Sequence, residues 1–178
     1  ASSATTAAAN AKKAEGNTYF KARDYAKAIE LYTEAVNLDP ENHVFYSNRS
    51  AAYAAAGDWE NAARDGNKCV SLNPDFLKGY HRAANALKHL QRYKDAVTTI
   101  ERGLNKFGNN ADFRKLYDEL KALYADQEKK RRAGMKGAEK IKEEGNDLFK
   151  AANFPGAIEK YTEAYNACKD KTSKLALT

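Results

Sequence analysis

The chain has 178 residues and a formal net charge of +6, and 30% of its residues are charged. Its mean hydropathy is -0.79, and no run approaches the roughly 18 apolar residues that a membrane-spanning helix needs. Its two cysteines, Cys69 and Cys168, are far apart and lie in no metal-binding or redox spacing. These features predict a cytoplasmic protein of a reducing compartment, and the positive charge suits an acidic partner.

The first residues, "ASSATTAAAN", are small and uncharged and lack the basic and leucine-rich parts of a secretory signal. We expect residues 1–8 to form a flexible N-terminal arm.

From residue 9 onward the chain repeats itself with a period of 34 residues. Five sets of similar residues follow this spacing: Gly16, Ser50 and Ala84; Tyr25, Trp59 and Tyr93; Ala28, Ala62 and Ala96; Ala35, Cys69 and Gly103; Pro40 and Pro74. Each repeat holds two amphipathic segments joined by a short polar turn, which predicts a helix hairpin. Proline ends the second helix, and small residues let the two helices approach closely. Such a hairpin cannot bury its apolar face alone, so the repeats must stack.

This period and these residues resemble the tetratricopeptide repeat, with three repeats between residue 9 and about residue 110. An apolar stripe at helical spacing follows, which predicts one long helix that covers the third repeat; it consists of Phe113, Leu116, Tyr117, Leu120, Leu123 and Tyr124. The resemblance implies an all-α fold, a right-handed superhelical solenoid of antiparallel helix pairs with a capping helix. We assign it to residues 9–133.

A fourth repeat begins after this helix. "KEEGNDLFKAANFPGAIEKYTEAY" matches "KAEGNTYFKARDYAKAIELYTEAV" of the first repeat, with Gly145, Ala157 and Ala164 in the small-residue positions. We interpret residues 134–178 as the first repeat of a second domain, truncated before its stacking partners.

Side chains rich in hydrogen-bond donors recur on the first helices of the three repeats. In a stacked array these helices line the concave surface, and the donors are Lys13, Asn17, Asn48, Lys78 and Arg82. Lys78 and Arg82 are one turn apart, as are Lys13 and Asn17, so each pair shares a helix face. Lysine, arginine and asparagine amides together suit a cluster of carboxylate oxygens, such as a peptide C-terminus beside an Asp side chain.

The segments "NHVFYSNRSAAYA", "GDW", "LNPD" and "KGYHR" are similar to the first repeat domain of the Hsp-organising, stress-inducible (Hop/Sti) co-chaperones. This resemblance implies that Lys13, Asn17, Asn48, Lys78 and Arg82 form a dicarboxylate clamp. In that family the clamp holds the Glu-Glu-Val-Asp (EEVD) tail of heat shock protein 70 or heat shock protein 90. The similarity to the first domain favours heat shock protein 70, and the implied role is that of an adaptor.

Around the clamp, we expect six residues to line the groove and tune which chaperone is preferred: Phe20, Ala51, Ala55, His81, Lys88 and His89. In the fourth repeat, Lys142 and Asn146 occupy the positions of Lys13 and Asn17. They predict half of a second clamp, so that the complete parent protein bridges two chaperones.

Other functions find less support in the sequence. His81 and His89 have no further ligand at metal spacing, so we expect no metal and no cofactor. The run "KKRR" at 129–132 lacks interleaved aromatic residues and predicts a solvated face rather than a nucleic-acid site. No phosphate-binding loop, nucleophile elbow or zinc signature is present, which argues against an enzyme. The alternative is a docking module of a larger enzyme, an isomerase or phosphatase, targeted to heat shock protein 90.

Overall fold

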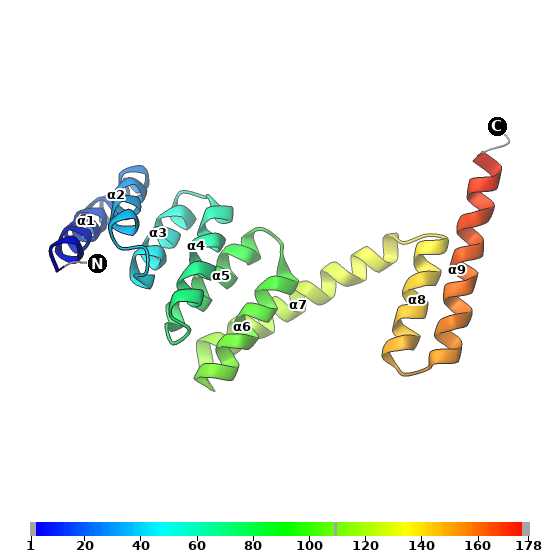
Figure 1. Cartoon of the computed structure of the whole chain (residues 1–178). Helices are drawn as coiled ribbons and strands as arrows, with labels where there is room; N and C mark the ends of the chain where they lie inside the picture. The colour runs from blue at the N-terminus through cyan, green and yellow to red at the C-terminus, as the bar shows by residue number, and fades with distance from the viewer. Residues whose placement is uncertain (1–2, 109, 176–178) are drawn as a thin grey trace. The chain divides into compact units, whose positions relative to one another are not determined.

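The computed structural model describes the backbone of residues 3–108 and 110–175, and the side chains of residues 4–108 and 110–169. This part of the chain folds into nine α-helices, shown in Figure 1: α1 (Ser3–Lys21), α2 (Tyr25–Leu38), α3 (His43–Ala55), α4 (Trp59–Leu72), α5 (Leu77–His89), α6 (Tyr93–Phe107), α7 (Ala111–Gly134), α8 (Ala138–Lys150) and α9 (Phe154–Leu175). The helices pair as α1–α2, α3–α4, α5–α6 and α8–α9, as the four repeats predict. In the described segments no helix is both long and apolar enough to cross a membrane.

The turns inside the hairpins share one backbone conformation. Arg23, Gly57 and Gln91, spaced by 34 residues, have φ values of 64°, 83° and 58°, and Ala152 of the fourth repeat has 59°. A residue with positive φ just after a helix is a common way to end it. Asp24 and Asp58 then start the next helix, because each side chain accepts a hydrogen bond from the backbone N–H three residues on. Only one of these four turns uses glycine, so the position is hard to recognise from sequence.

The small-residue positions lie where the two helices of a hairpin meet. Ala28, Ala62 and Ala96 are fully buried. A β-carbon on Gly16 would come within 2.8 Å of the Tyr32 ring, and one on Gly145 within 2.8 Å of the Tyr161 ring. The predicted close approach of the helices is therefore confirmed, and it recurs in the fourth repeat.

Contacts divide the chain into two compact units, which we call the first unit (residues 1–124) and the second unit (residues 125–178). The boundary falls inside α7, nine residues before the domain boundary expected at 133. The first part of α7 buries Phe113, Leu116 and Leu120 against the third hairpin, as expected of a capping helix.

The expected flexible arm differs from what is found. Helix α1 begins at Ser3, so residues 3–8 are helical. Alanine has the highest helix propensity, and Ala9 is fully buried in a cluster with Ala35 and Phe45. Both effects extend the helix toward the N-terminus.

Candidate functional site

Three first helices position the five candidate clamp residues in the first unit. Helix α1 carries Lys13 and Asn17, α3 carries Asn48, and α5 carries Lys78 and Arg82.

Asn17 is the centre of a hydrogen-bond group. Its side-chain oxygen accepts a hydrogen bond from the Tyr32 hydroxyl at 2.7 Å and a longer one, at 3.4 Å, from the Asn48 amide. With that oxygen turned to Tyr32 and Asn48, the N–H₂ group of Asn17 remains as a donor. Burial raises the pKa of Tyr32 and the Arg82 charge opposes this shift, so the hydroxyl stays protonated near neutral pH.

Arg82 is a half-buried cation without an acidic partner. Its Nε donates to the Ser47 hydroxyl at 3.0 Å, and Ser47 precedes Asn48 on α3. No carboxylate among the described residues pairs with it, and burial lowers its pKa. A guanidinium held in this way keeps donors that a carboxylate could accept.

Arg49 shows how the same chain neutralises a structural arginine. Its guanidinium donates two hydrogen bonds to Asp65, at 2.6 and 2.9 Å, and a third to the Thr33 hydroxyl. The Asp65 side chain is 6% exposed. Arg49 therefore joins α3, α4 and α2, whereas Arg82 is left open.

The two lysines also lack acidic partners among the residues that the structure describes. Lys13 donates to Asn10 at 3.0 Å and its Nζ lies 6.0 Å from the centre of the Phe45 ring. Lys78 is exposed one turn before Arg82 on α5. Hydrogen bonds thus join Asn17 to Asn48, and Ser47, the residue before Asn48, to Arg82. Lys13 lies one turn before Asn17 on α1, and Lys78 lies one turn before Arg82 on α5, so each lysine shares a helix face with a residue of this group.

A hollow of about 290 Å³ adjoins Arg82. It lies between α3 and α5, beside the start of α4, and its lining residues are Ser50, Ala54, Trp59, His81, Arg82, Asn85, Ala86 and His89. The His89 ring stacks on Trp59, with ring centres 3.7 Å apart and planes 5° apart. The hollow therefore offers an apolar wall next to a cation.

A second hollow, of about 330 Å³, lies between α5 and α7 and shares His81 and Asn85 with the first. The ion pair between Lys88 and Glu119 borders it. Partial burial and the neighbouring Arg82 lower the pKa of His81, while Asp112 opposes this shift. His81 is therefore mainly neutral at pH 7.

Of the other residues expected to line the groove, Phe20 packs against Tyr25, with ring centres 5.6 Å apart. Helix α3 contributes Ser50 and Ala54 to the lining of the hollow beside Arg82. The neighbouring residues Ala51 and Ala55 do not line this hollow, and their role in the groove stays a prediction.

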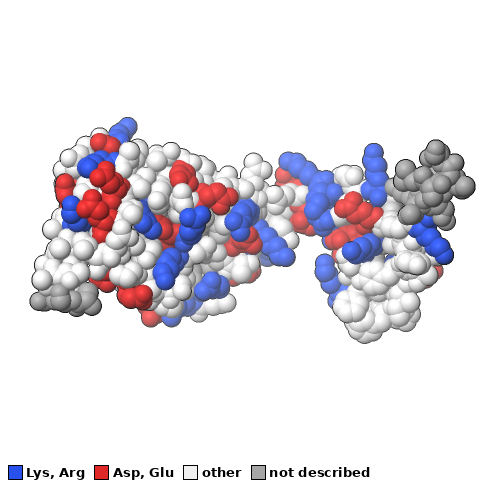
Figure 2. Space-filling view, turned by 45° about the horizontal axis from the view of Figure 1, so that its top comes forward, with Lys and Arg blue, Asp and Glu red and all other residues white. Residues whose placement is uncertain are grey.

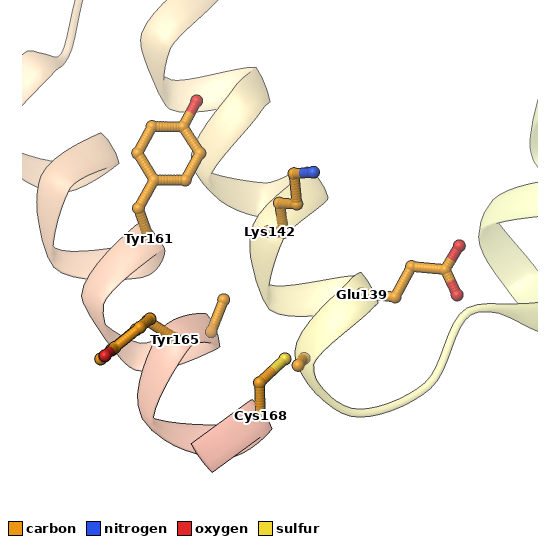
Figure 3. A pocket seen from close by; sticks show the side chains of 7 residues that line it. Glu139, Lys142, Tyr161, Tyr165 and Cys168 are labelled. Atoms are coloured by element: carbon orange, nitrogen blue, oxygen red, sulfur yellow. The ribbon is translucent and has the colours of Figure 1, made fainter. Parts of the chain in front are cut away.

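In the second unit, Tyr161 donates to the Asn146 oxygen at 2.9 Å, which repeats the bond between Tyr32 and Asn17. Here, however, the Asn146 amide also donates to Glu143 at 3.1 Å, and the first repeat has Ala14 at the position of Glu143. Lys142 is exposed beside an apolar hollow (Figure 3). Asn146 therefore repeats the tyrosine contact of Asn17 with one of its donors engaged, and the role of Lys142 stays a prediction.

The basic run at the end of α7 is paired within the second unit. Arg131 bonds Glu128 and Glu143, and Arg132 bonds Asp147 at 2.6 Å. Figure 2 shows basic and acidic side chains of this unit side by side. Arg131 and Arg132 of this run therefore contribute to ion pairs. In the part of the chain with described side chains, no three His, Cys, Asp or Glu residues are grouped as a metal would require.

Four further residues lie at this site and were not among the predicted site residues: Tyr32, Ser47, Trp59 and Asn85. Tyr32 had a signal: "YTEA" recurs at Tyr161, in each repeat 15 residues after the asparagine of the clamp position. Cys69, which shares its position in the 34-residue period with Ala35 and Gly103, is fully buried, and burial raises the pKa of its thiol to about 11.

Gly66 lets α5 approach α4 next to this site. A β-carbon at Gly66 would lie 2.7 Å from the backbone nitrogen of Ala83, the residue after Arg82. The position of Arg82 relative to α3 thus depends on having glycine, which has no side chain, at position 66 of α4.

Comparisons with known proteins agree with this architecture. Residues 9–42 match the tetratricopeptide repeat family. The heat shock protein sti1 homolog of Schizosaccharomyces pombe is 43% identical over 115 residues, which are 65% of this chain and 19% of the relative. The heat-shock protein cognate co-chaperone sgt12 of Aspergillus fumigatus is 32% identical over 146 residues, 82% of this chain and 41% of the relative. The chain thus spans less than half the length of these curated relatives.

Among solved structures, the first TPR of Spaghetti (RPAP3) bound to HSP90 peptide SRMEEVD is 32% identical, with a TM-score of 0.64. The alignment covers 67% of this chain and 95% of that one. The helices, their period and these matches show that the chain belongs to the tetratricopeptide-repeat proteins, built as α-helical solenoids. Within that class, it resembles the repeat domains of the Sti1/Hop co-chaperones.

Proposed function

We propose that the first unit binds the acidic C-terminal tail of heat shock protein 70 or heat shock protein 90, ending in Glu-Glu-Val-Asp, through a dicarboxylate clamp. The terminal carboxylate and the last Asp side chain accept hydrogen bonds from Lys13, Asn17, Asn48, Lys78 and Arg82. The chain then acts as an adaptor by binding alone, without catalysis, in the cytoplasm.

The observation that carries the proposal is Arg82. A half-buried guanidinium without a carboxylate partner is unfavourable unless a ligand supplies the charge, and the chain neutralises the comparable Arg49 with Asp65. The sti1 homolog, the relative named as a co-chaperone, and the HSP90 peptide bound to a similar repeat domain support the same ligand.

The affinity should be moderate. Charge-assisted hydrogen bonds contribute about 1.5–3 kcal/mol each, but ordering a flexible peptide offsets much of this gain. We expect micromolar binding, about -8 kcal/mol, that weakens as salt screens the charges.

Titration with a peptide ending in Glu-Glu-Val-Asp tests this function. Trp59, the single tryptophan, lines the hollow beside Arg82 and provides a fluorescence signal; calorimetry gives the affinity independently. The same peptide with an amidated C-terminus lacks one carboxylate and should bind at least tenfold more weakly. This corresponds to a loss of about 1.4 kcal/mol or more of binding free energy. Equal affinities would exclude the clamp.

We further propose that residues 9–133 form a three-repeat domain with its cap, and that residues 134–178 are the first repeat of a second domain. The Asn146–Tyr161 hydrogen bond and Lys142 support a second, half-formed clamp there. A parent protein with both clamps would bridge two chaperone tails.

A further inference from the structure

Arg49 and Arg82 use the same nitrogen for different partners. A guanidinium group carries five N–H donors, one on Nε and two on each Nη. A carboxylate accepts two of them either side-on, from Nε and one Nη, or end-on, from both Nη groups. Arg49 binds Asp65 side-on, because Nε donates to one carboxylate oxygen at 2.6 Å and Nη2 donates to the other at 2.9 Å.

In Arg82 a hydroxyl already occupies the side-on edge. Nε donates to Ser47 Oγ at 3.0 Å, so a carboxylate cannot accept the Nε–H without displacing this serine. The two Nη groups have no partner among the residues with described side chains. In that same part of the chain no buried side-chain nitrogen or oxygen lacks a hydrogen-bond partner, so these Nη groups are accessible to solvent. The end-on edge of Arg82 therefore remains for a ligand.

Ser47 is itself held firmly by its surroundings. Its side chain is 1% exposed, and it lies on α3 directly before Asn48. Burial raises the pKa of the Cys69 thiol on α4, and a hydrogen bond with the Ser47 hydroxyl opposes this shift. A hydroxyl has one donor and two acceptor positions, so Ser47 can donate to the thiol while it accepts from Arg82. The oxygen that receives the Nε–H is thus fixed by α3 and α4.

We propose that Ser47 is a positioning residue of the clamp, which accepts the Nε–H of Arg82 and so leaves the two Nη groups to bind a tail carboxylate end-on. Ser47 touches no ligand in this arrangement and acts through Arg82. The ligand part of this proposal rests on the proposed tail binding, whereas the contact between Ser47 and Arg82 belongs to the free chain.

The other buried serine of α3 has a different task. Ser50 is fully buried, and its hydroxyl donates to the carbonyl oxygen of Ala62 on α4 at 2.8 Å. That bond joins the two helices of one hairpin. Ser47 instead links α3 to a cation of the next hairpin, which is the side chain that the ligand is to contact.

The experiment is nuclear magnetic resonance of the arginine Nε–H groups in the 178-residue chain during titration with a peptide ending in Glu-Glu-Val-Asp. Arg82→Lys keeps the charge and lacks an Nε–H, so the signal that it removes belongs to Arg82. The Arg49 signal is the reference for a side-on contact with a carboxylate. We expect the Arg82 Nε–H signal to keep its position when the peptide saturates the chain. A shift toward the position of the Arg49 signal would overturn end-on binding.

Ser47→Ala tests the positioning role, because it removes the hydroxyl and no other heavy atom. In the free variant, the Arg82 Nε–H should exchange with solvent several-fold faster, and calorimetry should show tail binding weakened by about fivefold. Thr99→Val is the matched control: it removes a buried hydroxyl on α6 that donates to the Asp95 carbonyl oxygen, and should change neither quantity.

Three results would overturn the role of Ser47. They are an unchanged exchange rate in Ser47→Ala, an unchanged tail affinity, and a loss of the helical signal, which would make the serine a structural residue. A wild-type chain that binds no tail peptide would refute the proposed function and the end-on contact together. A chain that binds the peptide but shifts the Arg82 Nε–H would refute the end-on contact alone.

Discussion

At the scale of single residues, the arginines divide into structural and open ones. Arg49 has a buried acid, a hydroxyl and two tyrosine rings around it, so its charge is satisfied within the fold. Arg82 has one hydroxyl from Ser47. The presence of an acidic partner therefore marks Arg49 as a residue that stabilises the fold, and the lack of one marks Arg82 as a residue available to a ligand.

Substituting the two arginines should therefore have opposite consequences. Arg82→Ala should abolish measurable tail binding and leave the melting temperature unchanged or slightly raised, because a desolvated cation is removed. Arg49→Ala leaves Asp65 buried without its partner and should cost about 3–5 kcal/mol of folding stability. Calorimetry with the tail peptide and thermal melts by circular dichroism check both. A large loss of stability in Arg82→Ala would make that arginine structural.

His81 should make tail binding sensitive to pH. Its pKa in the free protein is lowered from 6.5 by burial and by Arg82, against the opposing effect of Asp112. Two carboxylates bound beside Arg82 would raise this pKa, so binding would take up a proton. Affinity should then increase as pH falls from 7 toward about 5.5, where the tail carboxylates are still ionised.

Binding constants measured across this range test the idea. The His81→Gln variant should bind the tail with an affinity that hardly varies with pH. The glutamine has no titratable group in this range but can still form a hydrogen bond with Asn85, the neighbour of His81. The same pH slope in both proteins would assign the effect to another group.

At the scale of elements, the contact between α4 and α5 controls where Arg82 lies. Gly66→Ala places a methyl group against the backbone of Ala83, so α5 must move; backbone cannot yield as a flexible side chain can. We expect a loss of about 1–3 kcal/mol in stability together with weaker tail binding. Chemical denaturation and peptide titration measure the two effects. Gly134→Ala is the matched control, because open space surrounds that position; comparable losses in both variants would refute the packing explanation.

Much of the fold follows from the 34-residue period, because alanine, glycine and aromatic positions report helix contacts directly. Ala28, Ala62 and Ala96 could be assigned to the core from that spacing alone. The start of α1 could not, because alanine-rich sequence is compatible with both a helix and an arm. Contacts between non-equivalent positions, such as Tyr32 with Asn17 or Ser47 with Arg82, could not be predicted either, because aligning the repeats compares only equivalent positions.

At the scale of the whole molecule, all five clamp residues lie in the first unit, and the core that supports them extends no further than α7. A chain ending after Tyr124 should therefore fold and bind the tail peptide with the affinity of the full chain. Calorimetry on both forms, alongside circular dichroism, gives the comparison. A markedly weaker affinity in a well-folded 1–124 chain would mean that the second unit takes part in binding.

The hydrogen bond from Tyr32 to Asn17 has a thermodynamic consequence for the clamp. It selects one rotamer of Asn17 before any ligand arrives, so association need not freeze that side chain, which otherwise costs about 0.5–1.5 kcal/mol. The second unit repeats this hydrogen bond with Tyr161 and Asn146, within the one hairpin that the structure describes there. Preorganisation of the asparagine thus belongs to the individual repeat and does not require the assembled groove.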